Sequence, residues 1–237
     1  MLKKTNYILF TKSTTGVMDM NILFGHEKIE RVTETKYLGV ILDQNLKWHS
    51  HVNKLLPKLR AANRLLYRLH KILDSNKLKM FYFAYVHSHI TYMCFSWGLA
   101  NQLLINKVRV LQNAAVRRVL NVDRFCSNKQ IYWMSAIIPF DALVKTCLTL
   151  LMYNHLNSNR RINTSIISNN DVHNYATRIS SNIRAPSINS THYGLNSSMY
   201  KAISLYNALP NEIKALTSLD VVKKRVKAFF LHAYLND

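Results

Sequence analysis

The sequence predicts an α+β fold that is predominantly α, with a small N-terminal antiparallel β-sheet followed by a helical body. β-forming runs separated by turn residues are confined to about the first 48 residues. Beyond them, apolar side chains recur at intervals of three and four residues, the period of an amphipathic helix. The chain is 49% hydrophobic, with 32 Lys and Arg against 12 Asp and Glu, a net charge of +20. These values indicate a packed core beneath a basic surface that suits a polyanionic partner.

The N-terminal segment carries short runs of β-formers. Gly25-His26 separates two of them as the turn of a hairpin, and Asp43-Gln44-Asn45 ends the last run. Within that last run, Gly39 would let another backbone approach closely. The predicted strands cover Thr5–Phe10, Asn21–Phe24, Lys28–Val32 and Lys36–Leu42.

A long basic helix begins near His49 and is most regular from Asn53 to Leu73. Its apolar stripe comprises Leu55, Leu59, Ala62, Leu66, Leu69 and Leu73. The opposite face carries a ladder of cations, Arg60, Arg64, Arg68 and Lys71. No acidic residue lies between Asp43 and Asp74 to pair with them. The ladder is therefore either a nucleic-acid contact or an ordinary solvated face, and the missing acids favour the contact.

The helices that follow are predicted from caps and periodicity. Asn101 and Ser218 are suitable N-caps, and Gly98 suits a C-cap. In the second helix, an aromatic stripe comprising Leu78, Phe81, Tyr82, Tyr85, His89 and Tyr92 is predicted to face the core. The predicted helices cover about Lys77–Tyr92, Gln102–Leu120, Ser127–Ser135, Pro139–Asn157, Ser197–Tyr206 and the residues after Ser218.

A segment rich in Asn, Ser and Thr, from Asn157 to Asn174, is predicted to be a flexible loop and the best domain boundary. The predicted organisation is therefore a β segment over residues 1–48, a helical domain over 49–157 and a C-terminal helical region over 158–237.

Enzyme signatures and metal-ligand patterns are absent from the sequence. Its three cysteines form no CxxC motif and are predicted to be free thiols in a reducing compartment. The pairs His49/His51 and His87/His89 cannot chelate on a helix, because residues two apart point in nearly opposite directions. No GxSxG or phosphate-binding glycine loop is present among five glycines. We expect no catalytic residue, no bound metal and no cofactor for this chain alone.

Membrane association is not predicted either. The N-terminus does not resemble a signal peptide, no stretch reaches transmembrane length without polar interruption, and no lipidation motif is present. The expected location is intracellular, in the cytoplasm, the nucleus or both.

Five motifs occur in order along most of the chain. They are KYLGVILDQNLKWHSHV from Lys36, YVHSHITYMCFSWG from Tyr85, LQNAAVRR from Leu111, HNYATR from His173 and YNALPNEI from Tyr206. Together they resemble the palm–thumb junction and following helical region of reverse transcriptases from non-LTR, jockey-like retrotransposons. Tyr206 stands where that family usually has tryptophan. Lys4 and Thr5 open a segment similar to the family's K-T-x-x-x-x-F pattern in the last part of the palm.

The resemblance implies a palm edge followed by a thumb-like bundle that binds nucleic acid, whether RNA, DNA or an RNA–DNA hybrid. It places Lys4 near the phosphates of an incoming nucleotide and the KYLG segment beside the primer end. The expected contact residues are Lys4, Tyr37, Leu38, Gly39, Trp48, Lys54, Lys58, Arg60, Arg64, Arg68 and Lys71, with Arg117 and Arg118 as a second tier.

The paired carboxylates of a polymerase are missing. Such enzymes hold two Mg²⁺ ions with a distant Asp and an Asp-Asp turn, and this sequence contains no Asp-Asp. The resemblance implies that the fingers and catalytic palm would lie before Met1, so the chain alone is expected to be inactive. It is then a nucleic-acid-binding fragment, a subunit that complements a separate palm and fingers polypeptide, or an inert transposon remnant.

Overall fold

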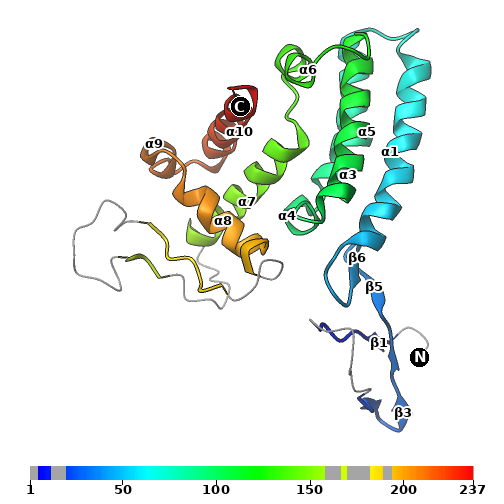
Figure 1. Ribbon diagram of the computed structural model, residues 1–237, viewed down its shortest axis with the longest axis vertical. Coiled ribbons are helices and arrows are strands. Elements are labelled where there is room, and N and C mark those ends of the chain that lie inside the picture. Colours follow the sequence, from blue (N-terminus) through cyan, green and yellow to red (C-terminus); the bar gives the residue numbers. More distant parts are fainter. Residues whose placement is uncertain (1–4, 12–19, 158–166, 170–181, 189–193, 237) are drawn as a thin grey trace.

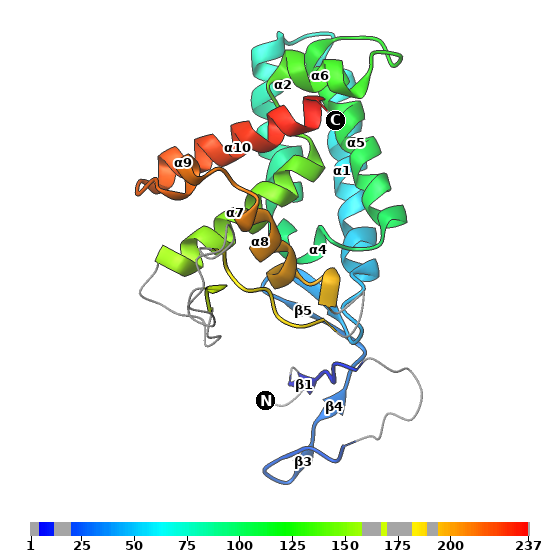
Figure 2. The same cartoon turned by 60° about the vertical axis from the view of Figure 1, so that its left-hand side comes forward.

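The computed structural model describes residues 5–11, 20–157, 167–169, 182–188 and 194–236 (Figure 1). It is mostly helical, with short strands gathered at the N-terminal end, so the predicted α+β, predominantly α class is confirmed. The strand-bearing segment extends away from the helical body, which begins where β6 meets α1 (Figure 2). Described strands are β1 (Asn6–Tyr7), β2 (Leu23–Phe24), β3 (Glu27–Lys28), β4 (Glu30–Arg31), β5 (Glu34–Tyr37) and β6 (Val40–Asp43).

These strands pair two by two within the described residues. β2 and β3 form the predicted antiparallel hairpin around Gly25, whose φ is +63°. β5 and β6 form a second antiparallel pair, whereas β1 and β4 run parallel. The parallel pair was not predicted, because strand direction depends on how the chain returns to β1 rather than on local pattern.

The predicted single strand over Lys36–Leu42 is wrong. Leu38 and Gly39 form a two-residue turn with φ of +45° and +84°, and the chain reverses there from β5 into β6. Positive φ at both turn residues matches the right-handed twist of the flanking strands. The group that approaches Gly39 is the ring of Tyr92, since a Cβ added at Gly39 would lie 3.2 Å from its Cε1 atom.

The helices from α5 to α8 agree closely with the predicted boundaries, whereas α1 ends at Leu69 rather than Leu73 and the helix predicted over Lys77–Tyr92 is divided into three parts. Asn101 and Ser127 accept hydrogen bonds from the first turns of α5 and α6, as expected of N-caps. The described helices are α1 (His49–Leu69), α2 (Ser75–Tyr82), the π-helical turn η2 (Phe83–His87), α3 (Ser88–Thr91), α4 (Cys94–Trp97), α5 (Gln102–Leu120), α6 (Asn128–Ser135), α7 (Phe140–Asn157), α8 (Ser198–Asn207), α9 (Asn211–Lys214) and α10 (Leu219–Asn236).

The aromatic stripe predicted for the second helix is only partly buried. Tyr85 and Tyr92 are more than half exposed, and His89 is half-buried. The buried positions follow one another at intervals of four residues. They are Leu78, Tyr82, Val86, Ile90 and Cys94. The π-helical turn over Phe83–His87 widens the helix there. Side chains four residues apart therefore stay on the buried face there, whereas in a regular α-helix they would gradually rotate away from it.

One buried cluster joins the helices. α1 and α5 pack side by side, and α7 packs against α8 and α10 (Figures 1 and 2). Trp97 stacks on Phe140 with ring centroids 5.3 Å apart, which links α4 to α7. α8 and α10 therefore share the core of the preceding helices, while the predicted division at residue 157 stays a prediction.

Candidate nucleic-acid interface

The junction between strands and helices is fixed by Asp43. Its carboxylate accepts hydrogen bonds from the backbone N–H groups of Asn45 (3.2 Å), Lys47 (2.9 Å) and Trp48 (2.7 Å). Trp48 precedes α1 with a left-handed φ of +64°. A non-glycine residue in that conformation is uncommon and requires support from its surroundings. The carboxylate of Asp43 provides that support, so the LDQNLKW segment sets the direction in which α1 leaves the strands.

His51 joins the junction to the helical body. Its ring lies 6.5 Å from that of Trp48 and 5.6 Å from that of Trp97, between centroids. Its Nδ1 atom accepts a weak hydrogen bond from the backbone N–H of Ile41 at 3.4 Å. Burial and the nearby charges of Lys58 and Lys54 lower the pKa of His51. The His51 ring therefore packs between Trp48 and Trp97 at the start of α1.

Tyr92 ties the β5–β6 turn to the helices. Its hydroxyl donates to the carbonyl of Leu38, and its own carbonyl accepts from Trp97 Nε1 at 2.9 Å. This contact leaves the side chains of Tyr37 and Leu38 exposed at 59% and 66%. The turn is thus held against Tyr92 while the side chains of Tyr37 and Leu38 face solvent.

Arg60, Arg64 and Arg68 of the predicted cation ladder lie on the exposed side of α1, and Lys71 is exposed just beyond its C-terminal end. The apolar stripe is buried against α5, and the basic side chains point away from it. Within the described residues none of them forms an ion pair, although Lys71 lies 5.8 Å from the ring of Tyr67. The exposed cations are Lys54, Lys58, Arg60, Arg64, Arg68 and Lys71.

The side chains of Arg117 and Arg118 are held in place by hydrogen bonds. Arg117 donates to the carbonyl of Cys126 at 2.8 Å and to Asn128 Oδ1 at 2.8 Å. Arg118 donates to Oδ1 of the buried Asn63 at 2.6 Å, and burial lowers its pKa. Both side chains are half-buried, so each fastens the C-terminal end of α5 to neighbouring segments. Lys4 and the HNYATR motif fall outside the described residues.

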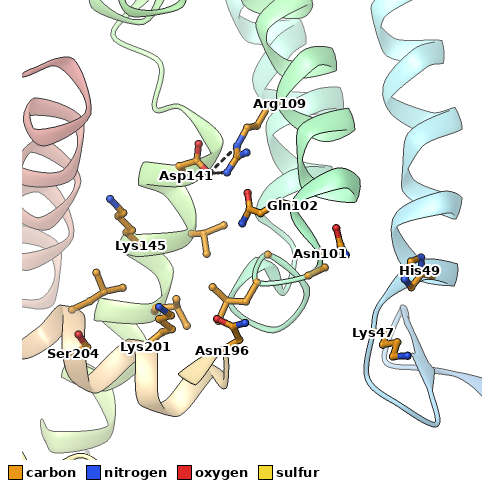
Figure 3. Close-up of a pocket in the computed structure, with 16 residues that line it drawn as sticks. Lys47, His49, Asn101, Gln102, Arg109, Asp141, Lys145, Asn196, Lys201 and Ser204 are labelled. Carbon is orange, nitrogen blue, oxygen red and sulfur yellow. Dashed lines mark hydrogen bonds and ion pairs between the residues drawn. The ribbon is translucent and has the colours of Figure 1, made fainter. Parts of the chain in front are cut away.

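A second basic surface was missed by the sequence reasoning. Lys47, Lys145 and Lys201 line a cleft between the junction loop and the α7–α8 pair (Figure 3). Each lysine is isolated in sequence and belongs to a different element. Only the fold brings them together, so no local signal could have identified them.

His87 is a half-buried titratable group outside these surfaces. Its Nδ1 atom is buried without a hydrogen-bond partner among the described residues. Burial, with a smaller contribution from the charge of Lys227, lowers the pKa of His87 to about 4. The neutral imidazole is therefore the form that the fold accommodates.

The stability of the protein should consequently fall in mild acid. Because the unfolded chain protonates His87 near pH 6.5 and the folded chain only near 4, unfolding takes up a proton between these values. From pH 7 to pH 5 we expect the free energy of unfolding to drop by about 2 kcal/mol. Urea titrations of the wild type and His87→Gln at both pH values measure this. An equal drop in the two proteins would contradict the assignment to His87.

Two negative findings apply to the described part of the chain. No group of three His, Cys, Asp or Glu side chains is placed to hold a metal ion. No single helix there is long and apolar enough to cross a membrane, and the α6–α7 pair passes that test only when its two helices, bent by 59°, are taken together.

Comparison with known proteins confirms the resemblance seen in the motifs. The chain is 33% identical over 101 residues to the probable RNA-directed DNA polymerase from transposon X-element of Drosophila melanogaster. It is 32% identical over 102 residues to the RNA-directed DNA polymerase from mobile element jockey of Drosophila funebris. Each alignment covers 41% of this chain but only 11% of the relative. The chain thus contains a region related to non-LTR retrotransposon reverse transcriptases. No family model and no solved structure matches it.

Proposed function

We propose that this chain is a nucleic-acid-binding, thumb-like fragment of a retrotransposon RNA-directed DNA polymerase, and that α1 holds the phosphate backbone of a duplex. The relatives are polymerases by name, and the aligned part is 11% of their length. Nucleic acid is the partner that their activity requires. The proposal assigns this chain the binding of that partner and not the polymerisation chemistry.

The exposed face of α1 carries the proposal. Arg60, Arg64 and Arg68 stand four residues apart, so they follow one line along the helix at intervals of about 6 Å. They are exposed and form no ion pair with any described residue. A duplex backbone would replace solvent around these guanidinium groups and release the counterions condensed on its phosphates. Binding through them should follow backbone shape rather than base sequence.

Catalysis by this chain alone is not part of the proposal. The sequence has no Asp-Asp pair to hold two Mg²⁺ ions. We infer that Mg²⁺ would act only in a complete reverse transcriptase, whose paired carboxylates would come from a palm outside the present sequence, on the same polypeptide or on a separate palm polypeptide. If such a partner exists, the exposed Tyr37–Leu38 turn is the part of this chain that would meet the primer end.

The Arg60/Arg64/Arg68→Ala triple variant tests the proposal. Three lost phosphate contacts should reduce the salt slope of binding to a labelled RNA–DNA hybrid by about 2.7, from about 0.9 per phosphate. At about 0.15 M salt, that slope corresponds to a roughly 100-fold loss of affinity. Fluorescence anisotropy across a salt series measures both quantities.

The matched control removes the same charge elsewhere. Lys223, Lys224 and Arg225 are exposed on α10, and their triple alanine variant should bind the hybrid within about threefold of the wild type. Equal losses of affinity in the two triple variants would show that net charge, and not the position of the arginines, controls binding. Equal binding by the α1 variant and the wild type would leave the ladder a solvated face and favour the remnant interpretation.

A further inference from the structure

A cleft of about 810 Å³ separates the strand–helix junction from the α7–α8 pair (Figure 3). Lys47 and His49 stand on one side of it, and Lys145 of α7 and Lys201 of α8 on the other. The loop from Gly98 to Gln102 forms its base. The basic face of α1 points away from α5 and does not contribute to this cleft, so the two basic surfaces are separate.

The charge in the cleft is positive and largely uncompensated. Asp141 is the one carboxylate among its lining residues, and it pairs with Arg109 at 2.6 Å. Lys47, Lys145 and Lys201 form no ion pair within the described part of the chain. Three lysines around one hollow repel each other, and an anion placed between them relieves that repulsion.

The walls of the cleft are fixed without a ligand. The Arg109–Asp141 pair spans α5 and α7 at one end. Ser198 Oγ donates to the carbonyl of Phe95 at 2.7 Å, which anchors the start of α8 on α4. Gly98 lies so close to Val144 that an added Cβ would stand 2.6 Å from its Cγ2 atom. A ligand would therefore meet a preformed site and lose little affinity to reorganisation.

The size of the cleft limits what it can bind. Its volume falls within the roughly 300–1,000 Å³ range of sites for small ligands. A duplex is much larger than a small-ligand site of this volume, so the cleft suits an unpaired strand better. Such a strand would place phosphates near the lysines and sugars or bases near the amides of Asn101, Gln102 and Asn196.

We propose that this cleft binds the phosphates of a single-stranded nucleic-acid segment. The inference rests on the proposed function, since it assigns the unpaired strand to the cleft while α1 holds the duplex. Apart from His49, the lining residues carry no ring on which a base could stack. Recognition is therefore electrostatic and tolerant of sequence.

The Lys145/Lys201→Gln double variant tests the cleft. Neither side chain has a hydrogen bond or ion pair with another described residue, so the variant should melt like the wild type. With labelled oligothymidylate of about 12 nucleotides, the salt slope should fall by about 1.4 and the affinity at about 0.15 M salt roughly tenfold. Binding of a blunt RNA–DNA hybrid should stay within about twofold, because it depends on α1.

A Lys224/Arg225→Gln variant on α10 removes the same charge outside the cleft and should leave oligothymidylate binding nearly unchanged. An equal loss in both double variants, or no loss in either, overturns the cleft proposal. The α1 triple variant separates the two proposals. If it binds the hybrid normally while the cleft variant loses oligothymidylate, the assignment of α1 fails and the cleft stands.

Discussion

Replacing Gln112 by leucine is expected to lower the free energy of unfolding by about 3–5 kcal/mol. The amide of Gln112 is buried between three elements. Its Nε2 atom donates to the Tyr82 hydroxyl at 2.9 Å and to the carbonyl of Ile138 at 3.0 Å. Its Oε1 atom accepts from the backbone N–H of Phe140 at 2.7 Å. Leucine fills the space but leaves these buried groups unpaired, each at a cost of about 1–3 kcal/mol.

Chemical denaturation at neutral pH measures this effect against Gln130→Leu. Gln130 is exposed on α6, so the same replacement there should change stability by no more than about 0.5 kcal/mol. The N–H group of Phe140 lies at the start of α7, where no intrahelical acceptor is available. A loss below 1 kcal/mol for Gln112→Leu would show that water replaces the amide.

The example of Gln112 shows how far the sequence could lead. The boundaries of α5 and its Asn101 cap followed from periodicity and capping chemistry. The LQN motif was recognisable only by resemblance, because the partners of Gln112 lie 26 to 30 residues away along the chain. The sequence pattern therefore identified Gln112 as part of a motif but did not reveal the hydrogen bonds that it makes.

Two of the departures from the predicted fold have specific local causes. Lys36–Leu42 contains enough β-formers to suggest one strand, but the left-handed conformations of Leu38 and Gly39 turn it into a hairpin. The stripe through Tyr85 and Tyr92 fits an α-helical period that the π-helical turn interrupts. The hairpin involves a tertiary contact, since the exposed Tyr92 holds the Leu38–Gly39 turn through its hydroxyl.

The two candidate binding surfaces also differ in how far the sequence could predict them. The α1 ladder could be predicted because Arg60, Arg64 and Arg68 share one helix and a fixed period. The cleft could not, because Lys47, Lys145 and Lys201 meet only after α7 and α8 pack beside the junction. A row of charges at a helical period can be recognised in a sequence, whereas a charged cleft can be recognised only in the folded structure.

Replacing Gly98 by alanine should destabilise the protein by about 3 kcal/mol, the upper range for overpacking. Gly98 follows α4 with a right-handed φ of −66°, so its backbone conformation would suit any residue. Space is the constraint, because the added Cβ would lie 2.4 Å from the carbonyl oxygen of Cys94 and 2.6 Å from Val144 Cγ2. The predicted helix-ending glycine is therefore required for the space that it leaves beside the backbone of α4 and against Val144 of α7.

Thermal and urea unfolding of Gly98→Ala, Val144→Ala and the double variant measure the contact. Val144→Ala removes both methyl groups that the new Cβ would meet, at 2.6 Å and 3.1 Å, but leaves the carbonyl of Cys94 in place. The double variant should thus be more stable than the sum of the single losses predicts, by about 1–2 kcal/mol. If the losses in free energy of unfolding of the two single variants simply add, the strain in Gly98→Ala comes from the backbone of α4 alone. Gly98 and Val144 also line the cleft, so this packing contact shapes one wall of the proposed site.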